Sequence, residues 1–189
     1  MKTLLKLFIL LSLFIPVASA ESVTARDAVK QLSDRGAIIG DTVLIYGEPM
    51  ISAKYQDQGY RLVLSQCVQP DYACKITIFS ACQMAAPLTA TDLISFANEQ
   101  NKQATARGTM YADRDRSLGD VICIRSRRDL HREDVFDMTD VFVWHTILGD
   151  FSEAVETEKR RITVRDLLGV DEETQTSFAE RSFDPKSDN

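Results

Sequence analysis

Two apolar runs that meet at cysteines constrain the fold of this chain more than any other feature. Residues 60–67 contain the apolar run Leu62-Val63-Leu64 after Tyr60, and residues 74–82 contain two isoleucines, a threonine and a phenylalanine, which is typical of strands. The connection between them, residues 68–73, is polar and contains a proline, as turns often do. Together with a shorter run at 50–55, they predict a meander of three antiparallel strands.

The two cysteines also predict the register of this hairpin. Facing residues of an antiparallel pair keep a constant index sum, so a pairing of Cys67 with Cys74 places Val63 opposite Ile78. Both are β-branched apolar residues, which pair well across strands. We therefore predict a disulfide between Cys67 and Cys74.

The N-terminus has the layout of a secretory signal peptide. The first six residues include two lysines, residues 7–15 are apolar, and Ala18-Ser19-Ala20 places small residues before Glu21. The apolar run is shorter than the roughly 20 residues that a membrane-spanning helix needs. We predict cleavage after Ala20, a periplasmic or secreted protein, and no stable membrane insertion after cleavage.

All four cysteines follow this leader, and an even number in an exported chain favours disulfides. We expect the remaining two, Cys82 and Cys123, to be joined, which requires their strands to be neighbours. The spacing of the cysteines and histidines does not fit a zinc site. No Cys-x-x-Cys redox motif occurs either. We expect neither a metal nor another cofactor.

The net charge of the chain limits the classes of partner that it can bind. The net charge is −6, and it falls to −8 without the two lysines of the leader. An acidic chain lacks the basic footprint of a nucleic-acid-binding protein, so we expect no nucleic acid partner.

Capping signals predict where the helices begin. Thr24 with Asp27, and Thr89 with Asp92, each place an acidic residue three positions after a threonine, an arrangement that satisfies free N–H groups of a first helical turn. Besides the helices that begin there, the remaining predicted elements are strands at 106–112 and 120–125 and a long helix at 133–156.

The charged run Arg125–Arg128 is interpreted as a solvated loop between the last strand and the long helix.

This order, α-β-β-β-α-β-β-α, predicts an α+β fold in which helices pack on a single antiparallel sheet. We divide the chain into a signal peptide at 1–20, one α+β domain at 21–156, and a polar C-terminal extension at 157–189. From Asp171 onward this extension is polar and acidic, which predicts that this part of it is disordered.

The long helix carries more apolar residues than one face can hold. A seam of five residues at helical spacing is expected to pack on the sheet: Val141, Trp144, Leu148, Phe151 and Val155. Phe136, Phe142 and Ile147 lie off this seam. We expect them either to pack on another helix or to form an exposed surface for a client or a second copy of the chain.

No catalytic motif is present. The chain has no P-loop, no Gly-x-Ser-x-Gly and no His-Glu-x-x-His, and it contains only two histidines, His131 and His145. A nucleophile pair of Cys123 with His145 would be abolished by a disulfide at Cys123. We expect that the protein is not an enzyme.

The element order and several stretches resemble one family. The cysteine-flanked hairpin, Phe96-Ala97-Asn98, Arg132-Glu133-Asp134 and the run Trp144–Phe151 are similar to segments of the YbjN family, described as bacterial sensory transduction regulators. The resemblance covers about residues 24–155. Cys82 and Cys123 lie outside the pattern of that family.

The resemblance implies the fold of type III secretion chaperones, which hold extended segments of client proteins. Together with the N-terminal leader, it suggests an exported protein that binds an unknown protein or peptide in a chaperone-like or regulatory role, although the chaperones of this fold are cytoplasmic. A periplasmic small-ligand or envelope-stress sensor is the alternative. A fold does not fix a function, so the resemblance identifies no client.

Overall fold

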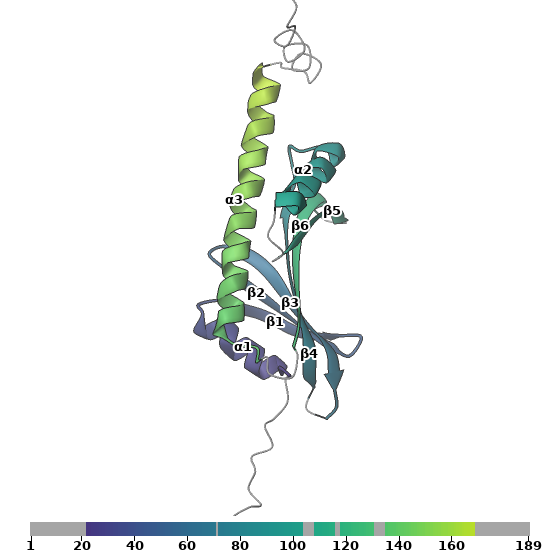
Figure 1. Ribbon diagram of the computed structural model, residues 1–189, viewed down its shortest axis with the longest axis vertical. Coiled ribbons are helices and arrows are strands. Elements are labelled where there is room, and N and C mark those ends of the chain that lie inside the picture. The colour runs from purple at the N-terminus through teal and green to yellow at the C-terminus, as the bar shows by residue number, and fades with distance from the viewer. Residues whose placement is uncertain (1–21, 71, 104–107, 116–117, 131–134, 169–189) are drawn as a thin grey trace, which may run out of the picture.

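The structure, a computed structural model, describes residues 22–70, 72–103, 108–115, 118–130 and 135–168. One antiparallel sheet of six strands has the order β1-β2-β3-β4-β6-β5, and three helices accompany it (Figure 1). The elements are α1 (Ala25–Asp34), β1 (Ile38–Ile45), β2 (Glu48–Tyr55), β3 (Gln58–Val68), β4 (Ala73–Met84), α2 (Ala90–Gln103), β5 (Thr109–Asp115), β6 (Gly119–Asp129) and α3 (Met138–Leu168).

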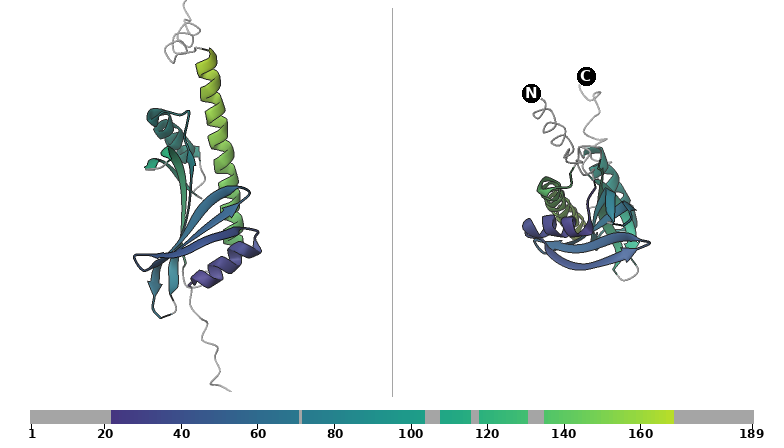
Figure 2. Two further views of the ribbon diagram at one scale, coloured as in Figure 1. Left: turned by 180° about the vertical axis from the view of Figure 1, so that it is seen from behind. Right: turned by 90° about the horizontal axis from the view of Figure 1, so that it is seen from below.

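The helices lie in two groups along the sheet. The first half of α3 lies beside α1 and the strands β1 to β4, whereas its second half runs past α2, which packs on β5 (Figures 1 and 2). The α+β class and the single antiparallel sheet are as the sequence predicts, but a fourth strand, β1, precedes the predicted meander.

The first two helices begin at their predicted capping boxes. The Thr24 hydroxyl accepts the backbone N–H of Asp27 at 3.2 Å. The Thr89 hydroxyl accepts that of Asp92 at 3.2 Å, and the Asp92 carboxylate accepts the N–H of Thr89 at 3.0 Å. These bonds satisfy N–H groups that a helix cannot pair internally, so short polar signals position both helices.

The long helix has different bounds from those that the sequence predicts. It begins at Met138 rather than Glu133, because Asp137 caps it by accepting the N–H of Thr139 at 2.7 Å. It continues to Leu168, so the predicted boundary at residue 156 falls inside α3. Ile162, which is 1% exposed, gives this second half an apolar anchor. The predicted signal peptide, His131 and residues 169–189 lie outside the described residues.

The charged run Arg125–Arg128 is not a loop. It belongs to β6, which pairs with β4 in a ladder from Ile76 opposite Asp129 to Met84 opposite Val121. A charged run can form a strand, because its side chains can point to solvent while its backbone stays hydrogen-bonded to the neighbouring strand.

The predicted seam of α3 forms the centre of the core. All five of its residues are at most 1% exposed. The indole of Trp144 stacks on Phe79 with 5.0 Å between ring centroids and meets Tyr60 edge-on at 5.8 Å. Burial of aromatic rings at this scale stabilises by several kcal/mol in total, on the order of 1.5–3 kcal/mol per large apolar side chain. The core therefore joins α3 to β3 and β4.

Candidate functional site

The structure pairs the four cysteines as two bridges. The Sγ atoms of Cys67 and Cys74 are 2.04 Å apart, and those of Cys82 and Cys123 are 2.03 Å apart. Cys67 faces Cys74 in the β3–β4 ladder, with Val63 opposite Ile78 as expected. The second bridge joins facing residues of β4 and β6. A bridged Cys123 has no thiolate with which to attack a substrate.

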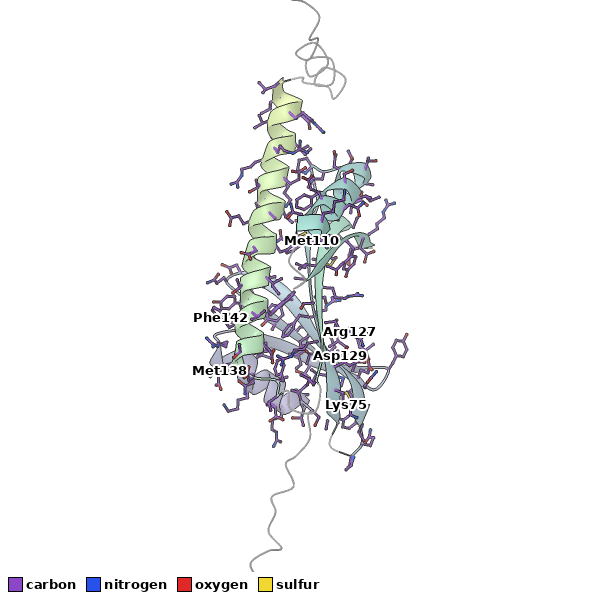
Figure 3. The ribbon with its side chains drawn as sticks, in the orientation of Figure 1. Lys75, Met110, Arg127, Asp129, Met138 and Phe142 are labelled. Atoms are coloured by element: carbon purple, nitrogen blue, oxygen red, sulfur yellow. A yellow bond between two sulfur atoms is a disulfide. The ribbon has the colours of Figure 1, made fainter. Side chains whose placement is uncertain are left out.

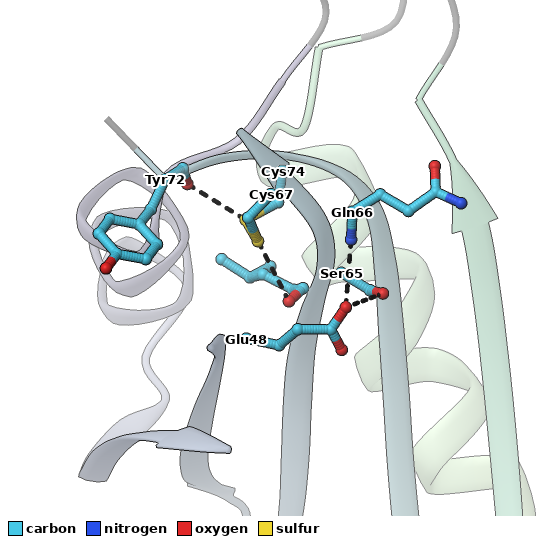
Figure 4. The surroundings of a disulfide bond; sticks show 7 residues. Glu48, Ser65, Gln66, Cys67, Tyr72 and Cys74 are labelled. Carbon is cyan, nitrogen blue, oxygen red and sulfur yellow. Dashed lines mark hydrogen bonds between the residues drawn. A yellow bond between two sulfur atoms is a disulfide. The ribbon is translucent and has the colours of Figure 1, made fainter. Parts of the chain in front are cut away.

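The first bridge lies beside an irregular point of β3. Gln66 has a positive φ of 55° there. The carboxylate of Glu48 on β2 accepts the backbone N–H of Gln66 at 3.3 Å and also the hydroxyl of Ser65 (Figure 4). A charge-assisted acceptor at this position replaces regular ladder bonds, so this end of the hairpin is held by Glu48 and the bridge together.

Of the three residues predicted to form an interaction surface, Phe142 alone is exposed. Its side chain is 55% exposed and lies beneath the guanidinium of Arg35, 5.5 Å from the ring centroid (Figure 3). Phe136 is buried and stacks near Phe79, and Ile147 is also buried in the core. The predicted surface is therefore wrong for Phe136 and Ile147, because the core extends beyond the seam.

His145 lies in an aromatic cluster between α3 and the sheet. Its ring stacks on Tyr55 with 3.6 Å between centroids, and its Nε2 lies 3.1 Å from the hydroxyl of Tyr60. Burial, and then the positive charge of Arg35, lower the pKa of His145 to about 4. Burial raises the pKa of the Tyr60 hydroxyl. His145 thus joins α3 to Tyr55 on β2 and Tyr60 on β3.

At one edge of the sheet, β5 is covered. The side chain of Asn101 on α2 bonds its backbone twice at Met110: the amide nitrogen donates to the carbonyl at 2.8 Å, and the amide oxygen accepts the N–H at 2.8 Å. The strand ends in three charged residues, Asp113, Arg114 and Asp115. Both features block the addition of another strand.

At the other edge, β1 has only β2 as a neighbour. Its apolar side chains other than that of Ile39, which packs against the core, are exposed, and Leu44 is 60% exposed. Asp41 is the one charged residue of the strand, which has no proline and bulges between Ile39 and Thr42. We name residues 38–46 the β1 edge; its exposed large apolar residues are Ile38, Val43, Leu44, Ile45 and Tyr46.

The β1 edge is the candidate functional site. An edge strand presents unpaired backbone N–H and C=O groups, and proteins usually protect it with charges, proline or a covering element. Among the described residues, no element other than β2 pairs with β1. No strand was predicted here, because Gly40 and Asp41 interrupt the run of β-branched residues.

Two further properties bear on the kind of site. None of the described helices is long and apolar enough to cross a membrane. Within the described part of the chain, no group of three histidine, cysteine, aspartate or glutamate side chains is arranged to hold a metal ion. A site built from backbone groups and apolar side chains is suited to binding a polypeptide.

Comparison with solved structures identifies the fold. YbjN from E. coli, described as a candidate transcription regulator, superposes with a TM-score of 0.53 at 11% identity, over 76% of this chain and 97% of that one. An uncharacterized protein from Methanothermobacter thermautotrophicus gives a TM-score of 0.41 at 10% identity, over 75% of this chain and 94% of that one. No protein-family model and no curated protein matches the chain. The chain thus shares its fold with YbjN.

Proposed function

We propose that this chain is an exported, non-enzymatic protein of the YbjN type that binds an extended segment of another protein along β1. Its role would be chaperone-like or regulatory. The observation that carries the proposal is the contrast between the covered β5 edge and the bare β1 edge. An extended segment added beside β1 would gain a ladder of backbone bonds, and its alternate side chains would meet the apolar residues of the edge.

The proposal of export rests on two independent features. The N-terminal residues have the pattern of a cleavable leader, and all four cysteines stand at bonding distance in two pairs. Disulfides persist in oxidising compartments such as the periplasm and are rare in the cytosol. A periplasmic or secreted location accounts for both features.

The alternative is a small-ligand or envelope-stress sensor. Small-ligand sites are enclosed and mostly apolar. A hollow of about 460 Å³ on α2 is instead open and lined by four polar residues, Ser95, Asn98, Glu99 and Lys102. This open, polar hollow gives the sensor no support, whereas the bare β1 edge supports a polypeptide partner.

The test uses one charged substitution on the edge and a matched control. The mature protein, with its disulfides intact, is used to capture partners from periplasmic extract, alongside Leu44→Lys and Ile94→Lys. Leu44 and Ile94 are similarly exposed, at 60% and 56%, but Ile94 lies on α2. We expect Leu44→Lys to lose a stoichiometric protein partner that Ile94→Lys retains, because an edge lysine opposes strand addition.

Amide hydrogen exchange on the purified complex then locates the contact. Binding along β1 should slow exchange at residues 38–46, because the added strand bonds these groups. A partner that binds Leu44→Lys with undiminished affinity would contradict the proposed site. A small molecule that co-purifies in place of a protein would favour the sensor.

A further inference from the structure

A second surface lies on the face of the sheet that points away from α1 and α3. The ladders align five polar residues of five strands in one row across this face. Ser52 on β2 faces Arg61 on β3, which faces Ser80 on β4; Ser80 faces Arg125 on β6, which faces Thr109 on β5. We name these five residues the arginine row.

Strand alternation places this row on the outer face. Leu62 and Ile124, the sequence neighbours of the two arginines, are buried in the core, so Arg61 and Arg125 point to the opposite side and are exposed. Adjacent strands lie about 4.8 Å apart. The two arginines are therefore about 10 Å apart at their backbones, with the hydroxyl of Ser80 between them.

The positive charge of this face is only partly neutralised. Arg127, two residues beyond Arg125, donates through two nitrogens to one oxygen of Asp129, at 3.1 and 2.9 Å. Figure 3 labels both residues on β6. Arg61 and Arg125 form no ion pair with any carboxylate of the described residues.

The guanidinium of Arg125 is held in place by an aromatic ring. Its central carbon lies 5.2 Å from the ring centroid of Tyr111, and one of its nitrogens lies 3.4 Å from the Tyr111 hydroxyl. A stacked guanidinium keeps its N–H groups free to bind an anion, and it loses less conformational freedom when it does so.

A row of apolar residues runs beside the arginine row. Met50 faces Val63, which faces Ile78, and Ile78 in turn faces Arg127. These three apolar side chains are half-buried. The two rows are two residues apart along each strand, or about 7 Å. The outer face thus presents parallel basic and apolar rows.

We propose that these two rows bind an extended acidic segment of a protein, which lies across the strands. Its carboxylates bind Arg61 and Arg125, and its apolar side chains contact Met50, Val63 and Ile78. Planar guanidinium groups suit carboxylates. The net charge of the whole chain, −6, repels a long polyanion such as nucleic acid, whereas a short acidic segment feels mainly the local arginines. This surface is independent of the proposed function at β1.

The probe for this surface is a labelled peptide of about ten residues in which glutamate and leucine alternate. In an extended chain its glutamates point to one side and its leucines to the other, as the two rows require. Binding is followed by fluorescence anisotropy at low ionic strength, where charge pairing is strongest. Wild type should bind this peptide and should not bind its glutamine counterpart.

The variant Arg61→Gln with Arg125→Gln should weaken binding at least about tenfold, since two charge-assisted contacts are lost. The control, Arg26→Gln with Arg160→Gln, removes the same charge from two helices and should change affinity less than about twofold. Circular dichroism establishes that each is folded. If the double variant unfolds, the two single variants replace it.

Three results would overturn this proposal. They are no binding by wild type, an equal loss in the control variant, and tighter arginine-dependent binding of a single-stranded oligonucleotide than of the peptide. Leu44→Lys should bind the acidic peptide as wild type does, which separates a failure at this face from a failure at the β1 edge.

Discussion

At one edge of the sheet, β5 has its backbone bonded by Asn101 and ends in charged residues, whereas at the other edge β1 presents apolar side chains to solvent. The same chain therefore contains the means to protect an edge and uses them on one side only. Edge strands tend to pair with other chains. The difference indicates that pairing is prevented at β5 and left available at β1.

The largest expected effect concerns the disulfide of Cys82 with Cys123, which joins β4 to β6, the strand beside β5. Cys82 and Cys123 are 41 residues apart, against 7 for Cys67 and Cys74, and a bridge that closes a longer loop restricts the unfolded chain more. Replacing Cys82 and Cys123 by alanine should lower the free energy of unfolding by about 4 kcal/mol, and replacing Cys67 and Cys74 by about 2 kcal/mol. Urea denaturation measures both, and equal losses would show that loop length does not govern them.

Acid should lower the free energy of unfolding through His145, which contacts β2 and β3. The pKa of His145 is about 4 in the folded protein and about 6.5 in an unfolded chain. The unfolded state therefore takes up the proton first, so stability is unaffected above pH 6.5 and falls between pH 6.5 and 4. The loss should reach about 2–3 kcal/mol.

His145→Phe separates this effect from the titration of carboxylates. The variant keeps an aromatic ring against Tyr55 but has no proton to gain, so its unfolding free energy should fall less across the same pH range. Urea midpoints at pH 7, 5.5 and 4.5 make the comparison. Parallel curves for the two proteins would rule out a role for His145.

Removing the cover of β5 should make the two edges alike. Asn101→Leu deletes both bonds to Met110 and should cost about 1–2 kcal/mol. It should also increase self-association, because a second edge becomes available. Asn98→Leu is the matched control on the exposed face of the same helix. Analytical ultracentrifugation that finds both variants equally monomeric would show that Asn101 does not protect the edge.

The smallest expected effect is on the stability of β1 itself. Leu44→Lys should change the free energy of unfolding by less than about 0.5 kcal/mol, because its exposed side chain makes few contacts that stabilise the fold. A loss of several kcal/mol in thermal denaturation would place Leu44 in the core and remove the basis for a binding edge.

The parts of the fold that local rules determine were predictable from the sequence. The threonine–aspartate pairs at Thr24 and Thr89 positioned two helices, and the cysteines gave the register of β3 with β4. The seam of α3 followed from helical spacing. Each of these signals depends on residues close in sequence or on a single cross-strand pair.

The parts set by tertiary contacts were not predictable. Gly40 and Asp41 interrupt β1 at its bulge, so its residues do not alternate and no strand was predicted. The long helix was predicted to begin at Glu133, although Asp137 caps it and it begins at Met138. The bond between Asn101 and Met110 joins a helix to an edge strand, and no local pattern encodes it. The candidate site therefore emerged only from the topology.

The length of α3 has a mechanical consequence. Its 31 residues span about 46 Å, and it is anchored near its start by the ion pair of Asp140 with Arg128 and near its end by that of Arg165 with Asp92. A helix resists bending, so a displacement of its first turns is transmitted to its last. Gly149 lies in the first half of α3, and a Cβ there would meet no atom within 4 Å, so packing does not require a glycine, which lowers the helical propensity at this point.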